Sequence, residues 1–295
     1  QRQICIRDRD NGEFKGDAIS TTSELVKISS DGNLGLQEGQ KFERGGIYRF
    51  TVDVTKGNTK AVLTVEKVGK VDLPAPDIFF GNSKMEVTDT DIYKSDQVFT
   101  RGQMITVTGI DNLNEWWIDP DFFEKQSDGT LKFLPINGDY RVTANGILKY
   151  FSVIALKDGK PAKLQDDGTG AIWAIGKGIG KPSVTSSEVG WETGKALCLA
   201  QVAPKKYQLT LKAGETLKTS GDWEAISFKF FYQNDWGGEF SNYASNTLVE
   251  QLKLTGSGNL EMQDNKAFEE GGVYRFTIDV TNGNANAILK VEKIN

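Results

Sequence analysis

Alternation of apolar and polar side chains is the dominant pattern along this chain. It is clearest in YRFTVDVT and AVLTVEKV, two runs separated by KGNTK, with Gly57-Asn58 at the bend. Residues that alternate in this way point to opposite faces of a β-strand, and a short polar insertion with glycine is typical of a hairpin turn. The pattern predicts a strand–turn–strand unit. No segment of ten or more residues shows a helical period, so we predict an all-β chain.

This unit occurs twice. Residues 42–68, FERGGIYRFTVDVTKGNTKAVLTVEKV, align without a gap with residues 268–294, FEEGGVYRFTIDVTNGNANAILKVEKI. From Gly12 to Lys67, 29 of the 56 positions aligned at this offset are identical, so we interpret the two segments as copies of one duplicated module. Asp10 aligns with Trp236 at the same offset, which suggests that the copies differ in a binding site and not in fold.

A linker is predicted at residues 71–77, VDLPAPD, because its two prolines interrupt sheet pairing. Residues 1–70 are then the carboxy-terminal half of a first β-sandwich module that repeats residues 228–295. The last third of the chain has a long segment before its repeated part, and the first copy has no room for an equivalent. We therefore expect the first module to be truncated and the native protein to continue upstream of Gln1.

The rest of the chain is predicted to form two further sandwiches. Residues 75–166 contain several short strands divided by Asn-Gly, Asp-Gly and Gly-Asp turns, which is typical of an immunoglobulin-like β-sandwich. Residues 167–295 form the last sandwich, with strands predicted at IWAIG, ALCLAQV, KYQLTLKAG, ISFKFFYQ, LVEQLKL, VYRFTIDVT and AILKVEKI. Residues 176–181, GKGIGK, are predicted to be a glycine-rich turn and not a phosphate loop, because Pro182 follows where a phosphate loop needs Ser or Thr.

Composition removes several classes of chemistry. The chain has no histidine, which excludes Ser-His-Asp and Cys-His catalysis and the commonest zinc sites. A net charge of −5 without a Lys/Arg-rich block argues against a nucleic-acid partner. Carboxylate-only chemistry such as glycoside hydrolysis stays open, as does binding without chemistry; we expect no enzyme and no cofactor. Cys5 and Cys198 lie in apolar runs and are interpreted as buried thiols.

One acidic segment raises the question of a metal. Asp119, Asp121 and Glu124 in IDPDFFEKQSDG offer oxygen atoms of the kind that bind calcium. Their spacing matches no known calcium loop, so we interpret the segment as an acidic surface turn and predict no metal site, with a structural calcium as the alternative.

The tryptophans carry the functional signal. Trp191 lies in SSEVGWETGK and Trp236 in QNDWGGEF, and neither polar setting suits burial, although a loop tryptophan that caps the core is the alternative. The face of an indole stacks on the C–H face of a sugar, whose hydroxyls need polar partners beside it. The nearby polar residues are Lys229, Asn234, Asp235 and Glu192.

The other tryptophans give weaker signals. Trp173 lies in an apolar strand and is predicted to be in the core, whereas Trp223 in TSGDWEAIS is ambiguous. Trp116 and Trp117 are adjacent, so in a strand they would face opposite sides and one would be exposed. We favour a domain interface over a second sugar platform for that residue.

With these residues the chain resembles the SusE/SusF-like surface glycan-binding lipoproteins of Bacteroidetes polysaccharide-utilisation loci. The resemblance runs through IWAIGKGIGKPSV, the GW pair at 190–191, LCLAQV, YQLTLKAG, FKFFYQNDWGGEF and GGVYRFTIDVTNG. It covers the last third and, through the repeat, the first 70 residues. It implies tandem carbohydrate-binding sandwiches, anchored by lipid to the outer face of the outer membrane beside a SusC/SusD-like importer.

The resemblance also implies a site. The family's sugar platform uses the tryptophan of the GW pair and the tryptophan that follows FKF, here Trp191 and Trp236, with Lys229 and the flanking polar residues as hydrogen-bonding candidates. Two departures are that Asp10 replaces the platform tryptophan in the first copy and that no lipidated cysteine stands at the start. The expected function is non-catalytic binding of an oligosaccharide or polysaccharide at the cell surface for import. The alternative is a structural or adhesive surface protein whose sandwiches act as spacers and bind protein partners.

Overall fold

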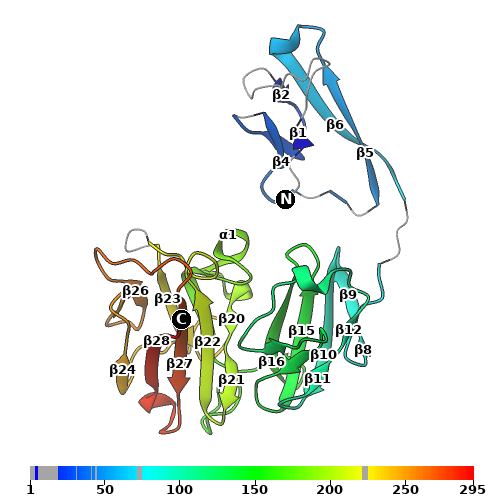
Figure 1. Cartoon of the computed structure of the whole chain (residues 1–295). Coiled ribbons are helices and arrows are strands. Elements are labelled where there is room, and N and C mark those ends of the chain that lie inside the picture. The colour runs from blue at the N-terminus through cyan, green and yellow to red at the C-terminus, as the bar shows by residue number, and fades with distance from the viewer. Residues whose placement is uncertain are drawn as a thin grey trace. The chain divides into compact units, whose positions relative to one another are not determined.

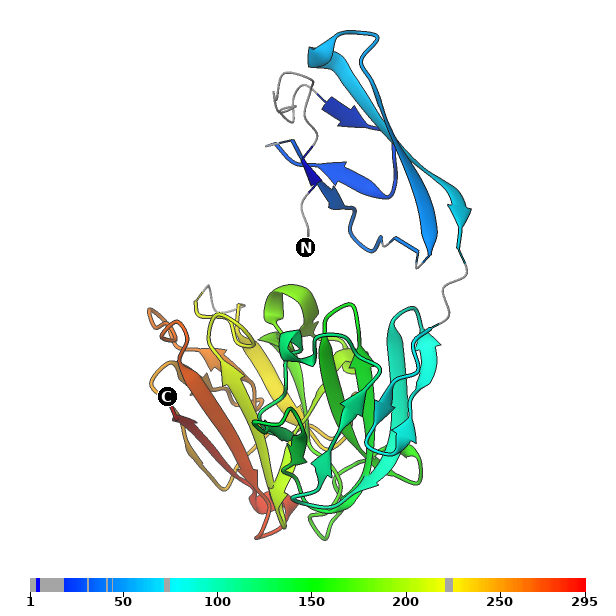
Figure 2. The same ribbon diagram turned by 45° about the vertical axis from the view of Figure 1, so that its right-hand side comes forward.

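The computed structural model divides the chain into two compact units, Gln1–Ala75 and Pro76–Asn295 (Figures 1 and 2). The boundary falls inside the predicted linker. Residues 4–5, 19–30, 32–40, 42–43, 45–71, 75–220 and 225–295 are described. Asp10, Trp223, linker residues 72–74 and the side chain of Cys5 lie outside the described part.

Almost all regular structure in the described residues is β, and the predicted all-β fold of tandem sandwiches is confirmed. The described helices are short. They are the α-helix α1 (Val184–Ser187) and the 3-10 helices η1 (Asn58–Lys60), η2 (Leu113–Glu115), η3 (Thr193–Lys195) and η4 (Asn284–Asn286).

The described residues of the first unit form two three-stranded sheets around a small core. That core consists of Ile19, Val26, Leu34, Ala61 and Leu63. One sheet has the order β1 (Ile4–Cys5), β4 (Asn33–Leu36), β3 (Val26–Ile28), and the other has the order β2 (Ile19–Thr21), β6 (Ala61–Lys70), β5 (Gly46–Asp53).

The middle segment, the first part of the second unit, forms a sandwich with its own aromatic core. Phe80, Phe99, Phe133 and Phe151 are fully buried in it, and Phe99 and Phe133 lie with ring centroids 4.9 Å apart. Its main sheet has the order β17 (Lys160–Pro161), β16 (Tyr150–Lys157), β15 (Gly138–Asn145), β10 (Ile92–Phe99), β9 (Glu86–Asp89). Two smaller sheets have the orders β11 (Met104–Ile105), β14 (Leu131–Phe133), β13 (Phe123–Lys125), and β12 (Val107–Thr108), β7 (Phe79–Phe80), β8 (Ser83–Lys84).

The last segment forms a second sandwich around the largest core. Phe228 of one sheet and Phe276 of the other meet across it, with ring centroids 5.5 Å apart. The first sheet has the order β19 (Glu188–Gly190), β18 (Trp173–Gly180), β23 (Ser227–Phe231), β26 (Leu260–Met262), β25 (Leu252–Leu254), and β20 (Leu197–Cys198) also pairs with β18. The second sheet has the order β21 (Ala200–Ala203), β22 (Lys206–Lys212), β27 (Val273–Asp279), β28 (Ile288–Lys293), β24 (Ser245–Thr247).

The glycine-rich segment at residues 176–180 is a strand, so the turn predicted there is wrong. It continues β18, and Gly176 pairs with Phe228 of β23. A Cβ atom at Gly176 would lie 2.4 Å from the Cα of Phe228, and the residue has a φ of +140°. Glycine is required here because two backbones approach closely. Since glycine has no side chain, the segment shows no alternation of apolar and polar residues, and the strand could not be recognised from the sequence.

The repeated sequence folds into the same hairpin in both copies. Tyr48 pairs with Lys67 in the first copy, and Tyr274 pairs with Lys293 in the second. The hydroxyl of each tyrosine accepts a hydrogen bond from the backbone N–H of a glutamate five residues before it, at 2.9 Å in the first copy and 3.3 Å in the second. The similar local sequence therefore gives the same register and the same loop closure in both copies.

Burial of the hairpin differs between the copies. Phe50 is 41% exposed, whereas its equivalent Phe276 is fully buried. Likewise Val54 is 44% exposed and Val280 is fully buried. In the second copy Phe228 and Phe230 of β23 pack on Phe276, whereas the described residues of the first unit leave Phe50 and Val54 open.

The middle and last sandwiches lie side by side in both views (Figures 1 and 2). Residue 166, the predicted boundary, lies near the point where the chain passes from one core to the other, but the cores do not divide there: Ala162 and Leu164 already pack in the last core, and Ala200 packs in the middle core. Trp116 stacks on Phe151 inside the middle core, while the indole N–H of Trp117 donates to the Glu215 carboxylate of the last sandwich at 2.6 Å. Trp117 thus lies where the two sandwiches meet, as the interface interpretation predicts.

Candidate functional site

Trp191 and Trp236 lie next to each other on the last sandwich. Their ring centroids are 6.3 Å apart and their planes are inclined by 25°. Trp191 directly follows β19, and Trp236 lies in the loop after β23. Trp236 is 52% exposed, whereas Trp191 is half-buried and packs against the core. The fold therefore joins the two predicted platform residues from separate parts of the chain.

The loop that carries Trp236 is closed by hydrogen bonds, among them one from the Tyr232 N–H to the Gly238 carbonyl at 2.7 Å. The Asp235 carboxylate accepts a hydrogen bond from the backbone N–H of Trp236 at 2.8 Å, and the Gln233 side-chain amide donates to the Trp236 carbonyl at 2.7 Å. The chain then turns back through Gly237 and Gly238, with φ of +82° and +75°, a region that favours glycine. These contacts hold the backbone that carries the exposed indole.

Phe231 supports the indole from below. This residue is the last of β23, is 1% exposed, and meets Trp236 edge to face with ring centroids 6.0 Å apart. Because side chains alternate along a strand, Phe231 and Lys229 point to the face of the sheet opposite the core residues Phe228 and Phe230. The predicted polar residue Lys229 therefore lies on the same face as Phe231 and Trp236.

The four predicted polar residues differ in what their side chains already contact. Asp235 caps the turn through one oxygen, and Glu192 pairs with Lys195 at 2.9 Å. The side chains of Lys229 and Asn234 form no hydrogen bond or ion pair with any residue in the described part of the chain. These two side chains are the hydrogen-bonding groups that a ligand on the tryptophans would find unoccupied.

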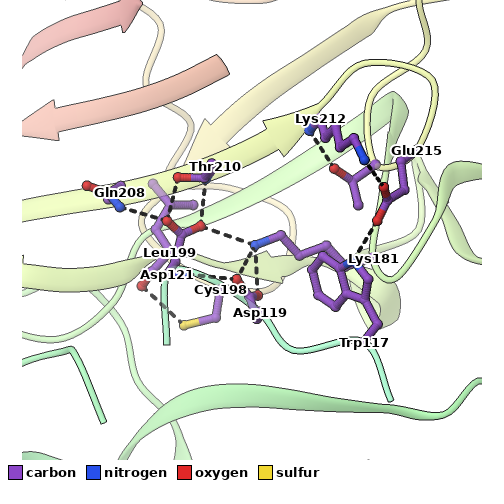
Figure 3. A network of polar contacts seen from close by, with 11 residues as sticks. Trp117, Asp119, Asp121, Lys181, Cys198, Leu199, Gln208, Thr210, Lys212 and Glu215 are labelled. Atoms are coloured by element: carbon purple, nitrogen blue, oxygen red, sulfur yellow. Dashed lines mark hydrogen bonds and ion pairs between the residues drawn. The ribbon is translucent and has the colours of Figure 1, made fainter. Parts of the chain in front are cut away.

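A second polar cluster lies inside the contact between the two sandwiches (Figure 3). The Lys181 ammonium lies 2.9 and 2.7 Å from the two carboxylate oxygens of Asp119 and 3.2 Å from an oxygen of Asp121. All three residues are at most 5% exposed. Lys181 directly follows β18 of the last sandwich, whereas both aspartates come from the middle sandwich just before β13.

Asp121 is also bound by β22 of the last sandwich. Its carboxylate accepts hydrogen bonds from the Gln208 amide at 2.7 Å, and from the backbone N–H and hydroxyl of Thr210, both at 2.6 Å. Burial disfavours its charge, but Lys181 and these donors outweigh burial and lower the pKa of Asp121. For Asp119 burial dominates and raises the pKa. Lys181 of the last sandwich and the two aspartates of the middle sandwich therefore join the sandwiches through buried, hydrogen-bonded ionic contacts.

The expectation of an acidic surface turn is thus wrong for Asp119 and Asp121. Glu124 is exposed and pairs with Lys132 at 3.2 Å, away from the other two. Within the described ranges no group of three or more Asp, Glu, Cys or His side chains is placed to hold a metal ion. No sequence pattern indicated Lys181 as the partner, because 60 residues separate it from Asp121 and it follows a glycine-rich run.

Cys198 is a buried free thiol, as predicted. It is 6% exposed and donates to the Leu199 carbonyl at 3.7 Å. Burial raises the pKa of Cys198 to about 12. A thiol with such a pKa stays protonated near neutral pH, so it has little nucleophilic character.

The chain belongs to the family described as "Domain of unknown function (DUF5121)", whose model matches residues 2–55 and 167–281, more than half of the chain. Positions 55 and 281 are equivalent in the internal repeat, so both matches end at the same place in the duplicated module. A second model, "Domain of unknown function (DUF5125)", matches residues 73–164, the middle sandwich. No curated protein matches the chain. None of the described helices is both long and apolar enough to cross a membrane.

Proposed function

We propose that this member of the family is a non-catalytic glycan-binding protein whose sugar platform is formed by Trp191 and Trp236. The observation that carries the proposal is the geometry of the pair: two indoles from different loops lie 6.3 Å apart and nearly parallel, and one of them is 52% exposed. Trp236 contacts Phe231 and Trp191, yet half of its surface stays exposed to solvent, which packing by itself does not account for. The sequence resemblance to SusE/SusF-like proteins supports the same conclusion.

The physical basis of binding is stacking combined with hydrogen bonding. Each contact between a sugar face and an indole contributes on the order of 1 kcal/mol, by analogy with other aromatic contacts. The Lys229 ammonium and the Asn234 amide lie on or beside the platform without partners among the described residues, and they supply donors for hydroxyl groups. Two stacking contacts and a few hydrogen bonds give affinities of roughly micromolar to millimolar. Repeated sugar units on a polysaccharide raise the effective affinity.

The proposed setting is the cell surface. By the same resemblance, we propose that the protein is held at the outer membrane by a lipid anchor and passes oligosaccharide or polysaccharide to a SusC/SusD-like importer. We propose no catalytic step. The carboxylates beside the platform are already engaged, Glu192 by Lys195 and Asp235 by the backbone N–H of Trp236. The acidic pair Asp119 and Asp121 is buried and bound by Lys181. The alternative of a spacer or adhesin requires both platform tryptophans to be buried or engaged in domain contacts, and the exposure of Trp236 weighs against it.

Affinity electrophoresis tests the proposal. Wild-type protein, Trp236→Ala and Trp191→Ala are run through native gels that contain plant, microbial or host polysaccharides. Phe50→Ala is the matched control, because Phe50 is also an exposed aromatic residue but lies in the first unit. We expect one glycan class to retard the wild type and Phe50→Ala, and to leave both tryptophan variants unretarded. If folded wild-type protein is retarded by no glycan, the proposal is wrong and the spacer or adhesin function is favoured.

A further inference from the structure

A cavity lies within the second unit, between the middle and last sandwiches and next to the platform. Its volume is about 340 Å³, which lies within the range of roughly 300–1,000 Å³ typical of small-molecule sites. One wall is the outward face of β15 and β16 of the middle sandwich. The opposite wall is formed by the loops of the last sandwich that carry the two platform tryptophans.

The wall from the middle sandwich carries polar side chains among apolar ones such as Leu148 and Ile154, where simple packing would favour apolar side chains alone. Val142 and Phe151 point into the middle core, so their neighbours Thr143 and Ser152 point outward, and these two are paired across the strands. Both line the cavity. A contact between two sandwiches is stabilised by apolar side chains that fill the space, yet here hydroxyl groups face an unfilled volume. Such a surface suits a polar ligand.

Two amide side chains face the same cavity. The Asn145 carbonyl oxygen accepts hydrogen bonds from the backbone N–H groups of Ile147 and Leu148 at 3.1 and 2.9 Å, so its orientation is fixed and its NH₂ group remains as a donor. Asn234, from the opposite wall, has no hydrogen bond to any described residue. Together with the hydroxyls these groups present both donors and acceptors, which is what sugar hydroxyls require.

The cavity and the platform share two loops. The 3-10 helix η3 (Thr193–Lys195) begins two residues after Trp191 and lines the cavity. Asn234 lies two residues before Trp236 and also lines it. A chain of sugars lying on the two indoles therefore has the cavity as its immediate continuation.

The charged groups at the cavity are already paired. Lys181 and Asp119 form the buried ion pair, and Lys195 pairs with Glu192. A carboxylate or sulfate on the ligand would find no unpaired cation among the described lining residues, and its desolvation would be uncompensated. The lining therefore favours an uncharged ligand.

We propose that this cavity is a second subsite that takes an uncharged sugar unit of the same glycan, beyond the units that stack on Trp191 and Trp236. The proposal rests on the proposed function of the platform. The proposal predicts that affinity depends on the length of the oligosaccharide. A short oligosaccharide covers the platform alone, whereas a longer one also forms hydrogen bonds in the cavity.

Isothermal titration calorimetry on the full chain tests this proposal. The probes are trisaccharides and hexasaccharides of the malto, cello, xylo, manno and laminari series, with oligogalacturonate of six units as the acidic probe. The variants are Ser152→Phe, which fills the cavity, and Thr143→Val, which removes one hydroxyl at nearly constant volume. Val98→Phe is the matched control, because Val98 lies on the same sheet, is 69% exposed and does not line the cavity. Trp236→Ala reports on the platform itself.

We expect the wild type to bind a hexasaccharide of one neutral series about five- to tenfold more tightly than its trisaccharide, the gain that one or two hydrogen bonds provide. Ser152→Phe should lose this gain and bind the trisaccharide as the wild type does. Thr143→Val should lose part of the gain in affinity. Because this substitution hardly changes the side-chain volume, its loss cannot be explained by disturbed packing, as that of Ser152→Phe could be. Val98→Phe should match the wild type.

The other outcomes separate the two proposals. Equal hexasaccharide affinities of Ser152→Phe, Thr143→Val and wild type overturn the subsite while leaving the platform intact. Unchanged binding by Trp236→Ala shows that the platform function is wrong, whatever the cavity variants do. Preferential binding of oligogalacturonate overturns the preference for a neutral sugar. A wild type that binds none of the probes overturns both proposals.

Discussion

Trp191 and Trp236 form one aromatic pair, but only one of them also supports the core. Trp191 packs against the core of the last sandwich, whereas Trp236 is 52% exposed and rests on Phe231 at the surface. The two residues therefore share a surface and differ in what their removal does to the fold.

Trp191→Ala and Trp236→Ala should both abolish glycan retardation but differ in stability. We expect Trp191→Ala to lower the free energy of unfolding by about 1–2 kcal/mol, because a half-buried side chain is removed from the core. Trp236→Ala should change it by less than about 0.5 kcal/mol, as for most surface substitutions. Urea unfolding followed by circular dichroism measures both. Equal losses of stability would show that Trp236 is a core cap.

Lys181→Met should be strongly destabilising because it leaves Asp119 and Asp121 buried without their cation. Breaking a buried ion pair in this way costs about 3–5 kcal/mol. The matched control is Lys253→Met, since Lys253 forms an exposed pair with Asp264 at 3.4 Å and such pairs contribute less than about 1 kcal/mol. Adding Asp119→Asn to Lys181→Met should recover part of the loss. A stability close to wild type for Lys181→Met alone would contradict the role given to the cluster.

Gly176→Ala should disrupt the pairing of β18 with β23. Its Cβ would lie 2.4 Å from both the Cα of Phe228 and the carbonyl oxygen of Ser227, at a φ of +140°. We expect a loss of about 2 kcal/mol or more, since backbone must move to accommodate the methyl group. Gly256→Ala is the control, because its Cβ would meet nothing within 4 Å. Thermal melts of the two variants give the comparison, and equal melting temperatures would contradict the expectation.

The repeat offers a matched pair of its own in Phe50 and Phe276. Phe276→Ala should cost about 3–5 kcal/mol, because it empties a fully buried site. Phe50→Ala, at the equivalent position, should cost less than about 1 kcal/mol in this 295-residue chain, because Phe50 is 41% exposed. Differential scanning calorimetry of both variants checks this. Similar losses would mean that the face around Phe50 is covered in solution.

Cys198 should resist alkylation until the protein unfolds. Because burial raises its pKa to about 12, the folded thiol remains protonated at pH 9, where about half or more of an unfolded thiol is ionised. The stabilisation linked to this shift is complete below the ordinary thiol pKa and is lost as pH rises from there towards the raised value. Iodoacetamide labelling with peptide mass spectrometry, with and without urea, measures it. Labelling of the Cys198 peptide at equal rates in both conditions would contradict burial of the thiol.

The local sequence pattern was sufficient to predict the hairpins. It was insufficient to predict features that depend on contacts between residues far apart in the chain. The alternation around Phe276 predicts β27, and the apolar run around Trp173 predicts a core tryptophan that is 2% exposed. Residues 176–180 were misassigned to a turn because strand glycines have no side chains to alternate. The Lys181 cluster was missed because nothing near Asp119 or Asp121 in the sequence indicates a cation that arrives from another sandwich.

The sequence alone determined that this is an all-β protein with a duplicated module, and it singled out Trp191 and Trp236 by their polar neighbours. Those features depend on residues that are close together in the chain, so the periodicity of apolar side chains and the residues at turns are sufficient to predict them. Only the tertiary structure decided that the two indoles meet, that Asp119 and Asp121 are buried against Lys181, and that a cavity with polar and apolar side chains lies beside the two tryptophans. These relationships depend on how separate sheets pack, and packing is a property of the whole unit that no local pattern contains.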